Sequence, residues 1–203
     1  MRLIGMLDSP YVRRTAISLK LMGFDFELDQ ISVFRGFEEF KAINPVVKAP
    51  TLVTDDGVVL MDSSLILDYA ERLAGPSRSL MPPGGRGQAE AFHVIGLALA
   101  ACEKAVQIVY ERNLRPPEKQ HQPWLDRVQG QLLAACGELE KSVPRQTDWF
   151  GGSKLMQPDV TVAVCWRFTQ HTVPEIATAS VFPRLAAFSA RAESLPAFTE
   201  TAF

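Results

Sequence analysis

The sequence has few of the residues that hold metals or form disulfide frameworks. Its 203 residues include three cysteines and three histidines. Cys102, Cys136 and Cys165 lie far apart in apolar helical stretches, with no Cys-x-x-Cys pair and no histidine at metal-ligand spacing. We therefore interpret all three cysteines as buried packing residues, predict no metal site, and assign the histidines no role.

The sequence also has no large excess of positive or negative residues, with 21 Lys and Arg against 23 Asp and Glu. The net charge is -2 and no basic cluster exceeds Arg13-Arg14, which argues against nucleic acid or an anionic membrane as a partner. The first apolar run, residues 3–7, is too short for a signal peptide, and we expect no stretch that approaches a membrane span. The sequence predicts a cytoplasmic protein with a small or neutral partner.

The first two fifths of the chain contain strand and helix patterns in alternation. An Asp-Gly pair at 56–57 between two β-rich runs predicts a hairpin. Earlier in the chain, two predicted strands flank a helix, and such a unit requires the two strands to be parallel. Since the hairpin adds an antiparallel pair, we expect a mixed sheet covered by helices. The predicted strands are 2–6, 25–33, 50–54 and 58–61, and the predicted helices are 10–22, 36–43 and 63–73.

A cluster of glycines and prolines then interrupts the pattern. Beyond it we find only helical periodicity, over residues 87–112, 123–141, 158–171 and 183–193. The sequence predicts an α/β domain over residues 1–76, a linker over 77–85 and an all-helical domain over 86–203.

The pair Ser9-Pro10 follows the first predicted strand and opens the first predicted helix. Serine as N-cap and proline at the first helical position form an ordinary helix start. The carboxyl end of a parallel strand and the amino end of a helix are also where α/β sheets bind ligands. The serine oxygen caps the helix by accepting an N–H, so its own O–H can donate outward.

The anion that gains most from such a donor is a thiolate. A free thiol has a pKa near about 8.5 and is mostly neutral at pH 7. A hydrogen bond to the charged form and the helix terminus together lower that pKa by roughly one to three units. A carboxylate is already ionised, so the site suits a thiol cofactor best.

These features, together with four further motifs, resemble the cytosolic glutathione transferase family, and in particular a bacterial branch with serine in the active position. The likeness covers essentially the whole chain. The motifs are Ser9-Pro10 with Arg13, Asn44-Pro45, Lys48-Ala49-Pro50-Thr51-Leu52-Val53, Asp62-Ser63, and Trp149-Phe150-Gly151-Gly152 with Asp159. The resemblance implies a thioredoxin-like N-terminal domain, a helical C-terminal domain, and glutathione as co-substrate.

The resemblance also implies a role for each site residue. Ser9 donates to the glutathione sulfur, and Ala49 before a cis Pro50 pairs with the cysteinyl unit. Asp62 faces the γ-glutamyl ammonium, and Ser63 binds its carboxylate at a helix start. Lys48 meets the glycine carboxylate. Lys41 and Arg35 are alternatives for that last contact.

Two departures from the family pattern bear on chemistry and folding. Serine rather than cysteine at position 9 argues against thiol transfer, since serine forms no mixed disulfide. Met156 replaces the hydroxyl residue three positions before Asp159, so we expect half of a capping box to be missing.

The resemblance implies a detoxification-type transferase that adds glutathione to a small hydrophobic electrophile and acts as a homodimer. A non-catalytic binding or regulatory protein and a glutathione-dependent isomerase or peroxidase remain alternatives. We expect the electrophile pocket to lie between residues 7–11, residues 33–34 and the first long helix of the second domain, near Glu103, Gln107 and Tyr110. The sequence leaves open whether these helix residues are instead core or interface positions.

Overall fold

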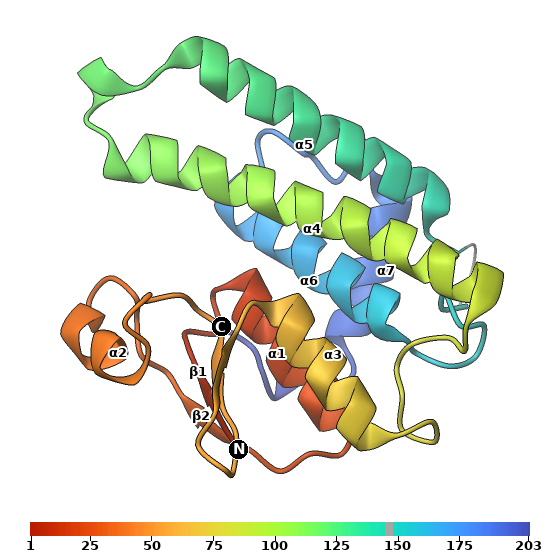
Figure 1. Cartoon of the computed structure of the whole chain (residues 1–203). Coiled ribbons are helices and arrows are strands. Elements are labelled where there is room, and N and C mark those ends of the chain that lie inside the picture. The colour runs from red at the N-terminus through yellow and green to blue at the C-terminus, as the bar shows by residue number, and fades with distance from the viewer. Residues whose placement is uncertain (145–147) are drawn as a thin grey trace. The chain divides into compact units, whose positions relative to one another are not determined.

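The computed structural model describes residues 1–144 and 148–203 and divides them into two compact units. The first unit consists of Met1–Met81 and Leu195–Phe203, and the second of Pro82–Ser194. Figure 1 shows both, coloured from red at the N-terminus to blue at the C-terminus. The last residues of the chain thus belong with its N-terminal part, whereas the sequence analysis included them in the helical domain over residues 86–203.

The first unit contains a four-stranded mixed sheet. Its strands are β1 (Arg2–Ile4), β2 (Glu27–Asp29), β3 (Thr51–Val53) and β4 (Val59–Met61). Their order is β2-β1-β3-β4, with β1 parallel to β2 and the other neighbours antiparallel. The predicted parallel pair and hairpin are both confirmed. Gly57 turns the hairpin at a φ of +84°, a conformation that glycine adopts readily.

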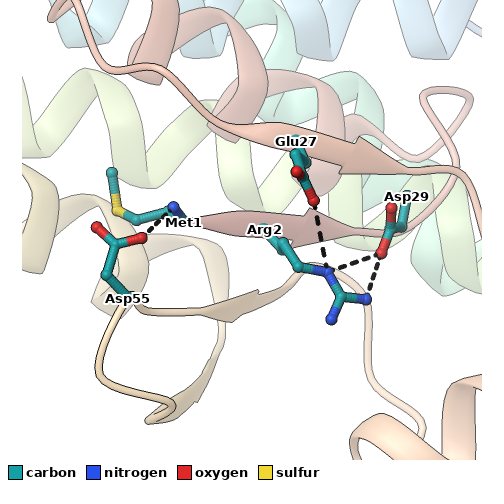
Figure 2. A network of polar contacts seen from close by, with 5 residues as sticks. All are labelled: Met1, Arg2, Glu27, Asp29 and Asp55. Atoms are coloured by element: carbon teal, nitrogen blue, oxygen red, sulfur yellow. Dashed lines mark hydrogen bonds and ion pairs between the residues drawn. The ribbon is translucent and has the colours of Figure 1, made fainter.

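Ion pairs hold the first two residues of the chain at the start of β1 (Figure 2). The terminal ammonium of Met1 lies 2.5 Å from Asp55 Oδ1. Nη2 of Arg2 lies 2.5 Å from Asp29 Oδ2, and its Nε lies 3.9 Å from Glu27 Oε2. Both carboxylates are on the neighbouring β2. Asp55 and Glu27 are largely exposed, so water screens their pairs and these contacts stabilise the fold only weakly.

Three helices complete the α/β part of the first unit. They are α1 (Pro10–Leu21), α2 (Phe37–Ile43) and α3 (Ser63–Ala74). Helices α1 and α3 lie side by side and share a buried core with the sheet (Figure 1). Leu3, Val12, Leu52 and Ile66 are all fully buried in that core. The sheet and these two helices therefore place the start of α1 and the start of α3 on one rigid support.

The second unit is a helical bundle. It consists of α4 (Gly85–Leu114), the short 3₁₀ helix η1 (Pro117–Lys119), α5 (Gln122–Ser142), α6 (Gln157–Thr172) and α7 (Pro183–Glu193). The four long helices begin and end within two residues of their predicted positions. Cys102, Cys136 and Cys165 are 2%, 1% and 1% exposed, which confirms their assignment as buried residues.

Helix α4 corrects one expectation. By length and composition it is apolar enough to cross a membrane, although the sequence analysis expected no such stretch. Its middle is rich in alanine and branched aliphatic residues, which a bundle core and a lipid bilayer accept equally. Within its unit α4 packs against both α5 and α6, as the core helix of a bundle does.

The start of α6 corrects a second expectation. The N–H of Met156 donates to Asp159 Oδ2 at 2.7 Å, and the N–H of Phe150 donates to Asp159 Oδ1 at 2.9 Å. The reciprocal half of the capping box is also present, with the Met156 side chain accepting from the backbone of Asp159. A thioether is a weak acceptor, so this half is weaker than a hydroxyl would make it, but it is not absent.

Candidate functional site

The start of α1 carries the proposed thiol-binding hydroxyl. Ser9 is the N-cap of this helix, and its Oγ accepts the N–H of Val12 at 3.5 Å, the outer limit of a hydrogen bond. Pro10 occupies the first helical position, as predicted. Because the cap bond is long and uses only a lone pair, the hydroxyl proton of Ser9 is not committed to it.

The loop before β3 lies beside the end of β1. The Ala49–Pro50 peptide bond is cis, which confirms the geometry implied by the resemblance. A Cβ added at Gly5, directly after β1, would lie 3.1 Å from the Cβ of Ala49. This close approach places the backbone of Ala49 next to the segment that leads from β1 to Ser9.

Two buried polar residues that the sequence analysis left without a role hold this loop. Asn44 Nδ2 donates to Thr51 Oγ1 at 2.8 Å, and Thr51 Oγ1 donates to the carbonyl oxygen of Lys48 at 2.8 Å. Asn44 and Thr51 are 3% and 0% exposed. The Asn-Pro motif therefore serves to fix the backbone of residues 44–51.

The start of α3 contributes a carboxylate and two hydroxyls. Asp62 is the N-cap, and its Oδ1 accepts the N–H of Ser64 at 2.9 Å. Its Oδ2 lies 4.0 Å from Nζ of Lys48, so the loop before β3 and the start of α3 meet through opposite charges. Both side chains are about half exposed and so remain accessible to a ligand.

Arg14 is a functional candidate that the sequence analysis missed. Its side chain is buried between α1 and α3, with 3% of the residue exposed. Nη1 donates to Ser63 Oγ at 2.9 Å and to Ser64 Oγ at 3.3 Å. The sequence analysis considered Arg14 only as part of the basic pair Arg13-Arg14. Its position in the predicted helix does not distinguish it from a surface arginine.

The remaining predicted residues lie on other elements. Lys41 lies on α2 at 3.9 Å from Glu38, and Arg35 is exposed. On α4, Gln107 donates to Glu103 at 2.8 Å within the second unit. The roles of these residues stay predictions from the sequence.

A surface cavity lies at the other end of the sheet. It has a volume of about 530 Å³ and is lined by residues that include Met1, Arg2 and Asp55. These groups flank the start of β1, whereas Ser9 follows its end. Met1 pairs with Asp55, and Arg2 pairs with Asp29 and Glu27, as Figure 2 shows, so we assign the cavity no part in the site.

The fold and this cluster define a class of protein. A thioredoxin-like sheet, a cis peptide bond before Pro50 and a helical bundle form the two-domain architecture of glutathione transferases. Two family models agree with this assignment. The model of the glutathione S-transferase N-terminal domain matches residues 3–78, and that of the C-terminal domain matches residues 122–191. The chain belongs to the glutathione S-transferase family.

Similar proteins support the same assignment. The crystal structure of a glutathione S-transferase from Methylobacterium radiotolerans, in complex with glutathione sulfonate, is 28% identical with a TM-score of 0.90. That match covers 98% of this chain and 93% of the other.

Curated proteins of two bacteria are also similar. The uncharacterized GST-like protein YibF of Escherichia coli is 27% identical over 140 residues, 69% of this chain and 68% of that protein. Maleylacetoacetate isomerase of Pseudomonas aeruginosa is 27% identical over 133 residues, 62% of this chain and 63% of that protein.

Proposed function

We propose that this protein is a glutathione transferase in which Ser9 stabilises the thiolate of bound glutathione for attack on a small hydrophobic electrophile. The observation that carries the proposal is the long cap bond of Ser9 at the head of a 12-residue helix. It leaves a hydroxyl proton available at the positive end of the helix dipole.

The expected gain in reactivity follows from the strengths of these interactions. A hydrogen bond to a charged group contributes about 1.5–3 kcal/mol, and a helix terminus about 0.3–1 kcal/mol. One pKa unit corresponds to about 1.36 kcal/mol. Ser9 and the helix start together therefore lower the pKa of the bound thiol by roughly one to three units, which raises the thiolate fraction at pH 7 from a few per cent to between about a quarter and nearly all.

The rest of the tripeptide would occupy the cluster around Ser9. The backbone of Ala49 before Pro50 pairs with the cysteinyl unit, and Lys48 meets the glycine carboxylate. Asp62 binds the γ-glutamyl ammonium, and Ser63 binds its α-carboxylate. The 4.0 Å separation of Lys48 and Asp62 supports this arrangement, because opposite charges held close together suit a ligand that carries both signs. We further propose that the protein acts as a cytoplasmic homodimer and uses no metal.

The thiol pKa of bound glutathione tests the role of Ser9. Titration of thiolate absorbance should give a pKa below that of free glutathione in the wild type, and a value raised by about one to two units in Ser9→Ala. Affinity for glutathione should change little. Ser77→Ala, an exposed serine beyond the far end of α3, is the matched control. An unchanged pKa in Ser9→Ala would remove Ser9 from the mechanism.

The similarity to maleylacetoacetate isomerase favours a second candidate, isomerisation of a cis-enone in which the thiolate adds to the substrate and is then released. A panel of an aryl halide, a cis-enone and a hydroperoxide separates the reactions. Consumption of glutathione with the aryl halide supports transfer. Conversion of the enone with no net consumption of glutathione supports isomerisation. Binding of glutathione without turnover of any of the three substrates supports a non-catalytic role.

A further inference from the structure

We propose that Val47 is a positioning residue whose strained backbone lowers the affinity of the loop before β3 for glutathione. The strain favours a relaxed form of this loop, whereas glutathione binds the form seen in the structure. This inference rests on the proposed binding of glutathione and adds a conformational equilibrium to it.

The backbone conformation of Val47 suits its side chain poorly. Its φ is +52°, in the left-handed region that favours glycine. The left-handed conformation is disfavoured for an L-residue by a factor of about 5 to 30 in population. A side chain branched at Cβ, such as that of valine, makes this φ a clear outlier, while asparagine accepts it more readily. The loop is therefore strained at Val47.

The strain lies at the proposed glutathione site. Among the residues that the structure describes, Val47 and Asp62 are the two non-glycine residues with a positive φ. Both lie at one ion pair, because Val47 directly precedes Lys48, whose Nζ is 4.0 Å from Asp62 Oδ2. Strained backbone in proteins is concentrated where ligands bind and where conformations switch. This placement links the strain at Val47 to ligand binding.

Hydrogen bonds on both sides of Val47 hold the strained form. The N–H of Val47 donates to the carbonyl oxygen of Asn44 at 2.9 Å, and the N–H of Val46 donates to Asn44 Oδ1 at 3.0 Å. Beyond Val47, the carbonyl oxygen of Lys48 accepts the hydroxyl of Thr51 at 2.8 Å. Asn44 and Thr51 are buried, whereas Val46 is 59% exposed. The ends of the loop are thus fixed in the interior, and its exposed middle has room to change conformation.

The balance between this hydrogen bonding and the strain sets the affinity. A relaxed φ at Val47 breaks its bond to Asn44, and a neutral hydrogen bond favours its own state by a factor of about 2 to 13. The strain opposes that bond by a factor of similar size, so the two forms of the loop are close in free energy. We expect the form in the structure to make up between about a tenth and a third of the unliganded protein. The apparent affinity of a ligand is reduced by that fraction.

Isothermal titration calorimetry with glutathione tests the inference. Val47→Asn accepts a positive φ and should bind glutathione about 3- to 10-fold more tightly than the wild type. Val47→Gly should also bind it more tightly, and it decides the matter if Val47→Asn fails to fold. Val46→Asn is the matched control, because it makes the same change at a neighbour whose φ is not positive, and it should leave the affinity unchanged. The thiol pKa of bound glutathione should be the same in all these proteins, because Ser9 lies on a different element.

Hydrogen–deuterium exchange measures the two forms of the loop directly. In the wild type, exchange over residues 44–51 should slow when glutathione binds, whereas in Val47→Asn it should be slow without the ligand. Unchanged or weaker glutathione binding by the Val47 variants would overturn the inference. If the midpoint of urea unfolding then rises, the strain affects folding alone. No binding of glutathione by the wild type would instead overturn the proposed function.

Discussion

Arg13 Nε in α1 donates to the carbonyl oxygen of Thr201 at 3.0 Å, a bond between positions 188 residues apart. Its Nη2 donates to the carbonyl oxygen of Phe198 at 3.1 Å, and the residue is 1% exposed. The end of the chain, including the short helix α8 (Pro196–Thr199), is thereby fastened to the helix that begins at Ser9. Arg13 acts as the internal anchor of the C-terminal segment.

We expect Arg13→Met to destabilise the protein by roughly 3 kcal/mol, because two buried carbonyl oxygens lose a charged donor while the apolar stem is kept. Urea unfolding measures the change. Lys20→Met is the matched control, since Lys20 forms an exposed pair with Glu200 of the same segment at 2.8 Å, a contact worth at most about 1 kcal/mol. If both variants lose the same stability, Arg13 is not the anchor.

Gly5 lies where the chain has no room for a side chain. Its φ is +140°, and an added Cβ would lie 2.5 Å from Val12 Cγ2 in α1. We expect Gly5→Ala to lower the free energy of unfolding by roughly 1–3 kcal/mol through overpacking, and to displace the start of α1 and so reduce activity. Thermal unfolding and glutathione affinity are the measurements.

Gly57→Ala is the control for backbone conformation alone. Gly57 has a φ of +84°, and nothing lies within 4 Å of its added Cβ. The variant should lose only about 1 kcal/mol and retain glutathione binding. Should Gly5→Ala bind glutathione as well as Gly57→Ala does, close packing at the end of β1 is not needed for the site.

Asp159 should make stability depend on pH. Burial raises the pKa of its carboxyl from 3.8 to about 6, opposed by the N–H donors of Phe150 and Met156. Because the folded-state pKa is the higher one, the stabilising contribution is present below pH 4 and is lost as the pH rises through about 6. We expect a loss of roughly 3 kcal/mol across this window.

Asp159→Asn has no proton to release and should lack this loss. Free energies of unfolding from pH 4 to 7, measured in urea for both proteins, give a difference curve that falls with pH. A curve that rises with pH would mean that the backbone donors outweigh burial and that the pKa of Asp159 is lowered.

The three cysteines should be unreactive in the folded protein. Burial raises the pKa of the Cys136 thiol far above its usual range. The pKa of Cys165 is also raised, first by a hydrogen bond with the side chain of Cys102 and then by burial. A thiol reagent such as DTNB should label none of them in the native protein and all three after denaturation in guanidinium chloride. Rapid labelling of the native protein would contradict this burial.

Much of the fold could be predicted because it depends on the conformational preferences of residues close together in the sequence. The Asp56-Gly57 turn specifies a hairpin, and Ser9-Pro10 specifies a helix start, through the conformations those residues prefer. Both features are present in the structure. The cis bond before Pro50 was expected only through the family resemblance, because most bonds that precede proline are trans.

The sequence by itself determined the order of the strands and long helices, the serine at the head of α1, and the family. Only the tertiary structure decided that the adjacent arginines bind different partners: Arg13 donates to the carbonyl oxygen of Thr201, and Arg14 donates to Ser63 Oγ. The physical reason is that the first bond joins positions 188 residues apart and the second joins positions 49 residues apart. Contacts between such distant positions produce no periodic pattern in the sequence. A buried arginine and a surface arginine have the same local sequence signature, and the packing of distant segments alone tells them apart.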